Sequence, residues 1–268
     1  MSVEVYTADE STPGIEDYDS FDVMGICPGL LRGIYSYGFE HPSTIQQRAI
    51  VPMSQGKDIL AQSQSGTGKT ATFLIGSLMQ ITSDFVENPQ VLIITPTREL
   101  ALQIQTVSKA LSNYTDTKCN VVIGGCNIRE DINKLRNEVN HIIVGTPGRI
   151  LHLLEKNYLL LKDLKCVVLD EVDKMLSIGF ENQIKDIFDH VSKDCQVAMF
   201  SATLSEHTKK VARHILNNPV QIFVRNAEVT LDGISQFYIN VQKDEYKVET
   251  LLDIYDKLSI SQTIIYVN

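Results

Sequence analysis

A glycine-rich segment near residue 66 is the first part of this sequence whose residue types and spacing could do chemistry. It follows an apolar run and opens a stretch of helical period, an arrangement in which backbone N–H groups and a helix N-terminus can face phosphate oxygens. Lys69 would reach the outer phosphates, and the Thr70 hydroxyl would ligate Mg²⁺. The segment departs from the strict phosphate-loop pattern because its first position is Ser63 rather than glycine. We expect it to bind nucleotide phosphates through Ser63, Gln64, Ser65, Gly66, Thr67, Gly68, Lys69, Thr70 and Ala71.

Two adjacent carboxylates could complete that phosphate site. Asp170 and Glu171 follow the apolar run 166–169, so they would lie where a buried strand ends. Asp170 is predicted to hold Mg²⁺ through water, with Thr70 as the other metal-site residue. Glu171 would orient or deprotonate an attacking water. The ordinary alternatives are a capping aspartate at a strand–helix junction and, for the loop, a Gly/Ser-rich turn beside a solvated lysine.

The elements that must position these residues alternate along the chain. Short apolar runs occupy 58–61, 91–95, 120–123, 141–144, 166–169, 196–200 and 220–224. Segments of helical period lie between them, at 99–111, 128–139, 149–156, 180–191 and 205–216. Such alternation predicts an α/β fold in which helices cover both faces of a parallel sheet. Ligands of such sheets bind beyond the carboxyl ends of the strands, where the loop and the carboxylates should lie.

The domain organisation follows from breaks in this pattern. Residues 1–19 carry six acidic and no basic side chains and are expected to be a solvated, disordered tail. Residues 20–224 form the predicted ATP-binding domain, and 225–235 read as a linker. A strand at 236–241, a helix at 245–258 and a strand at 263–267 would begin a second domain. These residues form one βαβ unit, which is too small to bury a core by itself.

Bulk composition excludes several classes of function. The net charge is −9, of which the acidic tail supplies −6, so the remainder is close to neutral and leaves room for only a local nucleic-acid track. The five cysteines form no CxxC pair, and neither they nor the six histidines suggest a zinc site. No apolar run is long enough to span a membrane, and no secretory signal is visible, so we expect an intracellular protein of the cytoplasm or nucleus.

Further motifs occur in a fixed order around the loop and the carboxylates. They are Gly38–Gln46, Pro96–Leu100, Gly124–Gly125, Thr146–Arg149, Asp170–Asp173 and Ser201–Thr203. This series, which extends over nearly all of residues 20–268, resembles the DEAD-box RNA helicases. Segments 30–35 and 61–70 are most similar to the translation initiation factor 4A group. The resemblance implies a RecA-like P-loop domain, followed here by the start of the second helicase domain.

The resemblance also implies roles for individual residues. Gln46 would read the adenine edge, Phe39 would stack on the base, and the His41 backbone would add a contact, whereas the alternative for Gln46 is a surface amide at a helix start. Ser201 and Thr203 would hydrogen-bond Asp173, completing the catalytic set Lys69, Asp170, Glu171, Asp173, Ser201 and Thr203. RNA would be held by its backbone at Pro96, Thr97, Arg98, Gly125, Thr146 and Arg149. Arg149 is the weakest member, because an arginine in the first turn of a helix can be merely solvated.

The expected function is that of an ATP-dependent RNA helicase with ATP and Mg²⁺ as cofactors. The partners would be RNA and scaffold or regulatory proteins, the chain being monomeric. The alternatives are an ATP-switched RNA clamp that anchors other proteins, and a DNA motor or other P-loop ATPase. Gln46 in its motif and the Asp170–Asp173 box disfavour the last of these. Val172 replaces the family's alanine in the Asp170–Asp173 box. No arginine follows Arg225, so the arginine that the family's second domain supplies to the ATPase site is missing, and the chain alone should hydrolyse ATP poorly.

Overall fold

The computed structural model describes residues 15–82, 87–224, 235, 237–259 and 261–267. Seven strands make up the sheet: β1 (Ile59–Gln62), β2 (Val91–Ile94), β3 (Cys119–Val122), β4 (Ile142–Gly145), β5 (Cys166–Leu169), β6 (Gln196–Ser201) and β7 (Val220–Phe223). Nine α-helices accompany them: α1 (Pro28–Tyr37), α2 (Thr44–Ser54), α3 (Lys69–Leu78), α4 (Arg98–Leu111), α5 (Ile128–Asn137), α6 (Pro147–Glu155), α7 (Val172–Ser177), α8 (Glu181–Phe188) and α9 (Glu206–Ile215). A 3₁₀ turn, Phe21–Val23, precedes α1. Every described helix is too short or too polar to cross a bilayer.

The strands form one sheet in the order β3-β4-β2-β5-β6-β1-β7, and every pairing in it is parallel. The predicted α/β architecture with a parallel sheet is therefore confirmed. The predicted strand limits are displaced by at most one residue at either end, because apolar composition identifies a buried strand but hydrogen bonding sets its limits. Since all strands run the same way, their carboxyl ends share one edge of the sheet, and β2 and β5 meet at its middle.

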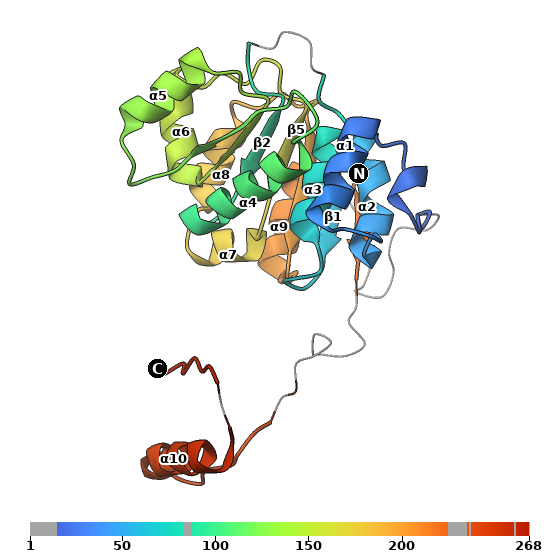
Figure 1. Cartoon of the computed structure of the whole chain (residues 1–268). Helices are drawn as coiled ribbons and strands as arrows, with labels where there is room; N and C mark the ends of the chain where they lie inside the picture. Colours follow the sequence, from blue (N-terminus) through green and yellow to red (C-terminus); the bar gives the residue numbers. More distant parts are fainter. Residues whose placement is uncertain (1–14, 83–86, 225–234, 236, 260, 268) are drawn as a thin grey trace. The chain divides into compact units, whose positions relative to one another are not determined.

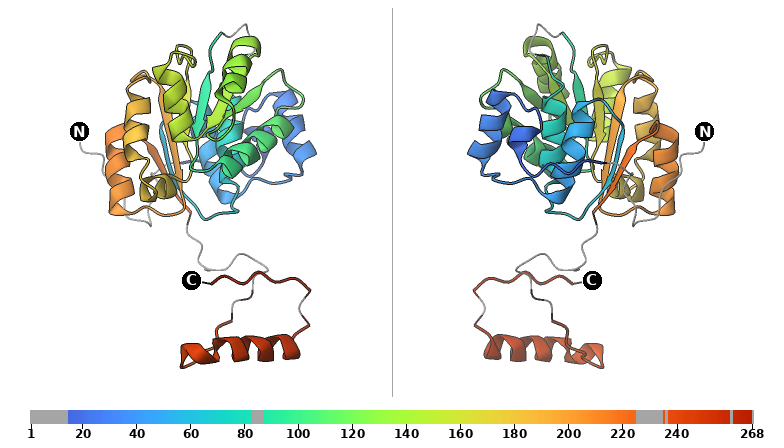
Figure 2. Two further views of the ribbon diagram at one scale, coloured as in Figure 1. Left: turned by 90° about the vertical axis from the view of Figure 1, so that its left-hand side faces the viewer. Right: turned by 90° about the vertical axis from the view of Figure 1, so that its right-hand side faces the viewer.

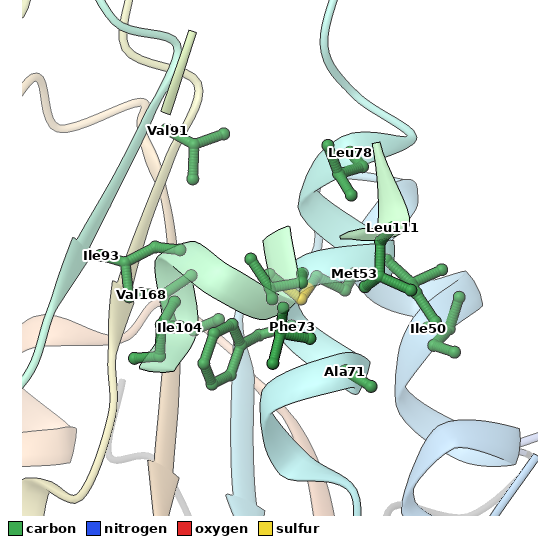
Figure 3. Close-up of a cluster of buried hydrophobic side chains, with 14 of the residues drawn as sticks. Ile50, Met53, Ala71, Phe73, Leu78, Val91, Ile93, Ile104, Leu111 and Val168 are labelled. Carbon is green, nitrogen blue, oxygen red and sulfur yellow. The ribbon is translucent and has the colours of Figure 1, made fainter. Parts of the chain in front are cut away.

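Helices cover both faces of the sheet (Figures 1 and 2). Each face has its own buried cluster. One cluster joins α1–α4 to the sheet, and Figure 3 shows side chains of α2, α3 and α4 meeting those of β2 and β5 there. Phe73 of α3 lies edge-on to Phe200 of β6, with ring centroids 5.3 Å apart. Both rings are fully buried, so replacing Phe73 by alanine would cost about 3–5 kcal/mol. The other cluster holds α6–α9 against the opposite face.

Capping explains where several helices begin and end. Helix α6 begins at Pro147, two residues before the predicted start, because proline suits the first helical position and needs no N–H partner there. Helix α5 ends at Asn137 rather than at the predicted Val139. The Asn140 amide donates to the carbonyls of Lys134, Leu135 and Glu138, which satisfies acceptors that the helix end leaves without partners.

Helix α1 approaches the end of α4 more closely than side chains would allow. A Cβ added at Gly29 would lie 2.5 Å from the Tyr114 carbonyl oxygen, and one at Gly33 would lie 1.9 Å from that of Leu111. Both distances are below any normal contact, and the obstacle in each case is backbone. Glycine in a helix interior is about 0.5–1 kcal/mol less stable than alanine. At these two positions the close packing of the helices requires glycine in spite of that cost.

Residues 15–19 belong to the predicted acidic tail. Ile15 and Tyr18 are half-buried against the core, and Asp17 forms an ion pair with Arg48 of α2, with Nε and Oδ1 2.6 Å apart. The described end of this segment therefore contacts the domain, because it carries two apolar side chains and faces a cation. Residues 1–14 of the predicted tail lie outside the described residues.

Residues 226–268 form a separate compact unit. Its described elements are a 3₁₀ turn, Asp244–Tyr246, and helix α10 (Lys247–Lys257), which lies within the predicted helix 245–258. The predicted strands at 236–241 and 263–267 are wrong for the residues that the structure describes, which have no strand assignment. Apolar alternation alone does not make a strand, and these segments pair with no neighbour. No described side chain of this unit is buried, and nearly all of the predicted linker lies outside the described residues.

Candidate nucleotide and nucleic-acid site

The glycine-rich loop joins β1 to α3 at the carboxyl edge of the sheet. Gly66 and Gly68 have φ angles of +84° and +95°, a left-handed backbone that costs other residues strain. The loop is cross-linked by its own side chains. The Ser63 hydroxyl bonds that of Thr67, whose own hydrogen is donated to the Gln64 carbonyl, and the Lys69 ammonium bonds the Ser63 carbonyl. The loop is therefore folded upon itself, with the lysine held at its centre.

Lys69 is a buried cation surrounded by carboxylates. Only 8% of the residue is exposed, and burial lowers the pKa of the ammonium. The negative charges of Asp170, Glu171 and Asp173 act in the opposite direction and favour the charged form. These three carboxylates come from the end of β5 and the start of α7, a strand–helix unit well separated in sequence from the one that carries the loop. The fold thus brings the predicted lysine and the predicted acidic box into one site.

Asp170 and Glu171 lie at the carboxyl end of β5. Burial, and to a smaller extent the Glu171 charge, raises the pKa of Asp170 to about 7, and Lys69 opposes the shift. Glu171 has φ 51° and ψ 49°, a left-handed conformation that a non-glycine residue adopts at a cost of about 1–3 kcal/mol and that is common at functional sites. Its carboxylate pairs with Lys174, with Oε2 and Nζ 2.8 Å apart.

Asp173 is bonded to the Ser201–Thr203 segment at the end of β6, as the family resemblance implied for these residues. Its Oδ2 accepts from the Thr203 hydroxyl at 2.9 Å and from the Thr203 backbone N–H at 3.1 Å. The Ser201 hydroxyl donates to the Thr203 carbonyl and accepts from the Asp173 N–H. Burial alone would raise the pKa of Asp173, but these hydrogen bonds hold it below its usual value. The network ties the end of β6 to the start of α7.

The predicted adenine-reading segment lies beside the loop. Gln46 is 2% exposed, so the alternative of a surface amide is excluded. Its Oε1 accepts from the Ser43 N–H at 2.8 Å, which makes it the third residue of a capping box on α2, and its Nε2 lies 3.5 Å from the Gly68 carbonyl. Both ends of the amide thus have protein partners. Phe39 is half-buried against the Tyr37 ring, and His41 is exposed.

The residues present fit a magnesium nucleotide. The loop offers two left-handed glycines and the N-terminus of α3, and Asp173 Oδ1 is buried without a hydrogen-bond partner among the described residues. The half-buried Thr70, in the first turn of α3, and Asp170 would supply the metal-site oxygens. The described residues contain no group of three or more metal-ligating side chains. Mg²⁺ needs none, because it binds through one or two carboxylates together with phosphates and water.

The other half of the same edge carries the residues predicted to contact RNA. Pro96 is buried after β2, and Thr97 caps α4 by accepting from the Leu100 N–H at 3.3 Å. Arg98 is exposed, and its guanidinium lies against Gly125, where a Cβ would be 2.1 Å from Nη1. Thr146 is half-buried at the N-cap of α6. Three loops, after β2, β3 and β4, thus lie side by side.

The side chain of Arg149 is largely buried and paired, so the alternative of a merely solvated arginine is excluded. Its guanidinium forms an ion pair with Asp131 of α5, and the two side chains are only 9% and 5% exposed. A second donor, Nη2, bonds the Cys126 carbonyl at 2.7 Å. Burial raises the pKa of Asp131, and the arginine opposes that shift.

Three residues of the site were not assigned from the sequence. Ser43 donates its hydroxyl to the Thr67 carbonyl at 2.8 Å, and its spacing from Gln46 is the capping-box signature that could have identified it. Lys174 lies one turn after Glu171, a spacing that favours an ion pair. Asp131 carries no such signal, because its partner comes from the next strand–helix unit.

Comparison with known proteins defines the class to which this fold and site belong. Residues 43–211 match the family model of DEAD/DEAH box helicases, and the chain belongs to that family. Its RecA-like fold accords with that match.

Two solved structures illustrate the relationship. A DEAD box protein from the hyperthermophile Methanococcus jannaschii is 33% identical, with a TM-score of 0.73 over 77% of this chain and 56% of that one. A variant of Dbp5 from S. cerevisiae, bound to a variant of Gle1 and to IP6, is 31% identical, with a TM-score of 0.76 over 91% of this chain and 60% of that one. This chain therefore spans somewhat more than half the length of either relative.

Proposed function

We propose that this chain is the ATP-binding part of an ATP-dependent RNA helicase that couples ATP hydrolysis to local separation of RNA strands. The observation that carries the proposal is the burial of Lys69 among Asp170, Glu171 and Asp173, directly after a glycine-rich loop. A buried cation at a helix N-terminus is suited to polyphosphate, and neighbouring carboxylates are suited to Mg²⁺ and to activating water. Family membership supports the ATP-dependent activity.

Within this proposal each residue has a distinct task. The loop from Ser63 to Ala71 holds the phosphates, and Lys69 neutralises the outer ones. Thr70 and Asp170 would hold Mg²⁺, which would offset phosphate charge. Glu171 takes the proton of the attacking water, for which its left-handed backbone and its pairing with Lys174 set the direction of the carboxylate. Asp173, Ser201 and Thr203 transmit the state of the nucleotide to the rest of the domain.

Adenine would be read by Gln46, with Phe39 stacking on the base and the His41 backbone assisting. Each end of the Gln46 amide uses one protein partner, the Ser43 N–H at Oε1 and the Gly68 carbonyl at Nε2, which leaves one acceptor site and one hydrogen of the amide for adenine. An amide pairs with adenine as both donor and acceptor. GTP and CTP should compete poorly, since they leave these groups without partners.

RNA would lie along the loops that contain Pro96, Thr97, Arg98, Gly125 and Thr146, and its binding would be independent of base sequence. The evidence is one exposed arginine beside an exposed glycine, with the helix N-termini of α4 and α6 pointing to the same edge. We place the protein with the translation initiation factor 4A group, in translation initiation or mRNA processing, in the cytoplasm or nucleus. The Dbp5–Gle1 complex supports protein partners for such a domain.

Turnover by this chain alone should be close to background. No arginine follows Arg225, whereas an arginine finger contributes a factor of about 10³–10⁵ in P-loop enzymes. The test compares ATP hydrolysis by this chain with that of the same chain extended by a complete helicase second domain, each with and without RNA. We expect RNA-stimulated hydrolysis and strand separation only in the extended protein. Rapid, RNA-responsive hydrolysis by the chain alone would overturn the two-domain mechanism. ATP hydrolysis without strand separation would favour an ATP-switched clamp. Stimulation of ATP hydrolysis by DNA as strongly as by RNA would favour a DNA motor.

A further inference from the structure

The buried pair of Asp131 and Arg149 lies directly beneath the loop after β3. Arg149 is in the first turn of α6, and Asp131 is in the first turn of α5. Both side chains are at least nine-tenths buried. A buried ion pair is weak evidence for stability, because desolvation offsets much of the attraction between the charges. A role in holding a particular backbone conformation is a better account of this one.

The geometry identifies the backbone that is held. One guanidinium nitrogen of Arg149 bonds Asp131, and the other bonds the Cys126 carbonyl at 2.7 Å. The Asn127 side chain caps α5 by accepting from the Arg129 N–H at 3.0 Å. From the other side, Arg98 lies against Gly125, which has φ +81°. Two arginines thus flank the 124–127 loop: Arg98 on its exposed face and Arg149 on its buried face.

The two arginines differ in the charge that they can offer a ligand. Arg98 is exposed, and the described residues include no acidic partner for it. The charge of Arg149 is already neutralised by Asp131, and its side chain is 9% exposed. A phosphate that approached Arg149 would meet a largely buried guanidinium that is already paired with a carboxylate.

We propose that Asp131 and Arg149 are positioning residues for RNA, and that Arg149 does not contact RNA phosphate. Together they hold the Cys126 carbonyl, and with it the Gly125 backbone, in the conformation that receives the RNA backbone. Asp131 is then as necessary for RNA binding as Arg149, although it is an acidic residue in a protein that binds a polyanion. This inference rests on the RNA-binding function proposed above.

The test uses the salt dependence of RNA affinity, which counts the phosphates that a protein neutralises. Each phosphate contact to a single strand contributes about 0.7 to the slope of log affinity against log salt concentration. The probe is a short fluorescent oligouridine, titrated with this chain at low and rising salt. Arg98→Gln is the control for a direct contact, and it should lower the slope by about 0.7.

The deciding variant is Asp131→Asn. If Arg149 contacted phosphate, removing its neutralising partner would strengthen RNA binding and steepen the slope. Our inference requires the opposite: affinity lower by about tenfold, as loss of a charged hydrogen bond implies, with an unchanged slope. Arg149→Lys keeps the positive charge but cannot reach both partners with a planar fork, so it should weaken binding similarly. Tighter binding by Asp131→Asn, or unchanged binding by both variants, overturns the inference.

A second measurement is independent of RNA. Hydrogen–deuterium exchange of the amides at 124–127 should be faster in Asp131→Asn and in Arg149→Lys than in the unmodified chain, while ATP affinity stays the same. Unchanged exchange in these amides would overturn the inference even if a variant bound RNA weakly. If instead Arg98→Gln has no effect on affinity or slope, the RNA-binding proposal itself fails, which the exchange experiment would not show.

Discussion

The two halves of the sheet's carboxyl edge differ in how deeply their charged groups are buried, although both belong to the same parallel sheet. Beyond β5, β6 and β1, charged groups are buried together: Lys69 is 8% exposed and Asp170 is 4% exposed, and the pKa values of both are shifted by burial. Beyond β2, β4 and β3, the surface consists of exposed backbone, helix caps and the exposed arginines Arg98 and Arg129, and the charged pair Asp131–Arg149 lies underneath. Burial changes the pKa values of charged groups and so can make them reactive. Holding a polymer backbone needs only a matching shape and accessible charge.

The largest expected effect comes from removing the buried cation, Lys69, which tests whether the two halves of the edge act separately. Lys69→Ala should weaken binding of ATP·Mg²⁺ by about a hundredfold or more, since charged hydrogen bonds to phosphate are lost, while the fold is kept. Isothermal titration calorimetry measures the affinity. Lys185→Ala, which removes an exposed lysine on α8, is the matched control and should bind as the unmodified chain does. ATP binding by Lys69→Ala within twofold of normal would sink the assignment of the loop. A parallel loss of oligouridine binding would show that the two halves are not separable.

A second change separates base reading from helix capping. Gln46→Glu keeps an acceptor for the Ser43 N–H, so the capping box on α2 survives, but it removes the amide donor that adenine requires. We expect the preference for ATP over GTP to fall by about tenfold, together with a loss of stability because the new carboxylate is buried facing the Gly68 carbonyl. Competition binding of the two nucleotides measures the ratio. Gln55→Glu, at the exposed end of the same helix, should leave the ratio unchanged. An unaltered ratio in Gln46→Glu would mean that the amide does not read the base.

A third change concerns the hydrogen bond between the Ser63 and Thr67 hydroxyls within the loop. Ser63→Ala removes the hydroxyl that bonds Thr67, so less of the loop's own hydrogen bonding must be broken when phosphate enters. ATP affinity should rise by about threefold to tenfold, as expected for one hydrogen bond of about 0.5–1.5 kcal/mol. Thr67→Ser keeps the hydroxyl pair and is the matched control. Weaker binding by Ser63→Ala would show that the hydroxyl holds phosphate instead of bonding Thr67.

The smallest expected effect lies at the opposite, amino edge of the sheet, just before β4. His141 is buried before β4 and accepts from the Lys118 N–H at 3.0 Å, and burial, with a smaller contribution from Lys118, lowers its pKa. The unfolded chain therefore takes up a proton more readily than the folded chain. This contribution to stability is present above about pH 6.5 and is lost as the pH falls through the folded-state pKa. Chemical denaturation of His141→Asn, which keeps an acceptor, should show a shallower loss of stability below pH 6.5. Parallel curves for the two proteins would contradict this.

The success of the sequence analysis differed between these regions for physical reasons. The strands were found because a parallel sheet buried on both faces requires continuous apolar runs, and the residues after them were grouped correctly because parallel strands share one edge. The bonding of Asp173 to Ser201 and Thr203 was anticipated only through family resemblance. No local sequence signal predicted the burial of Asp131 or its pairing with Arg149, because an aspartate in the first turn of a helix is usually an exposed cap partner. The two strands expected after residue 235 failed because a strand requires a neighbour, which composition does not supply.

The glycine contact between α1 and α4 limits how this sequence can vary. Helix α1 leads into the segment that contains Phe39 and Gln46, while α4 begins at Arg98, so the contact at Gly29 and Gly33 joins the supports of both halves of the edge. In a scan of all single substitutions, these two positions should tolerate no replacement, alanine included, although neither has a positive φ and neither touches a ligand site. Most buried positions accept another side chain of similar volume. Here backbone meets backbone, and any added atom would separate the two helices.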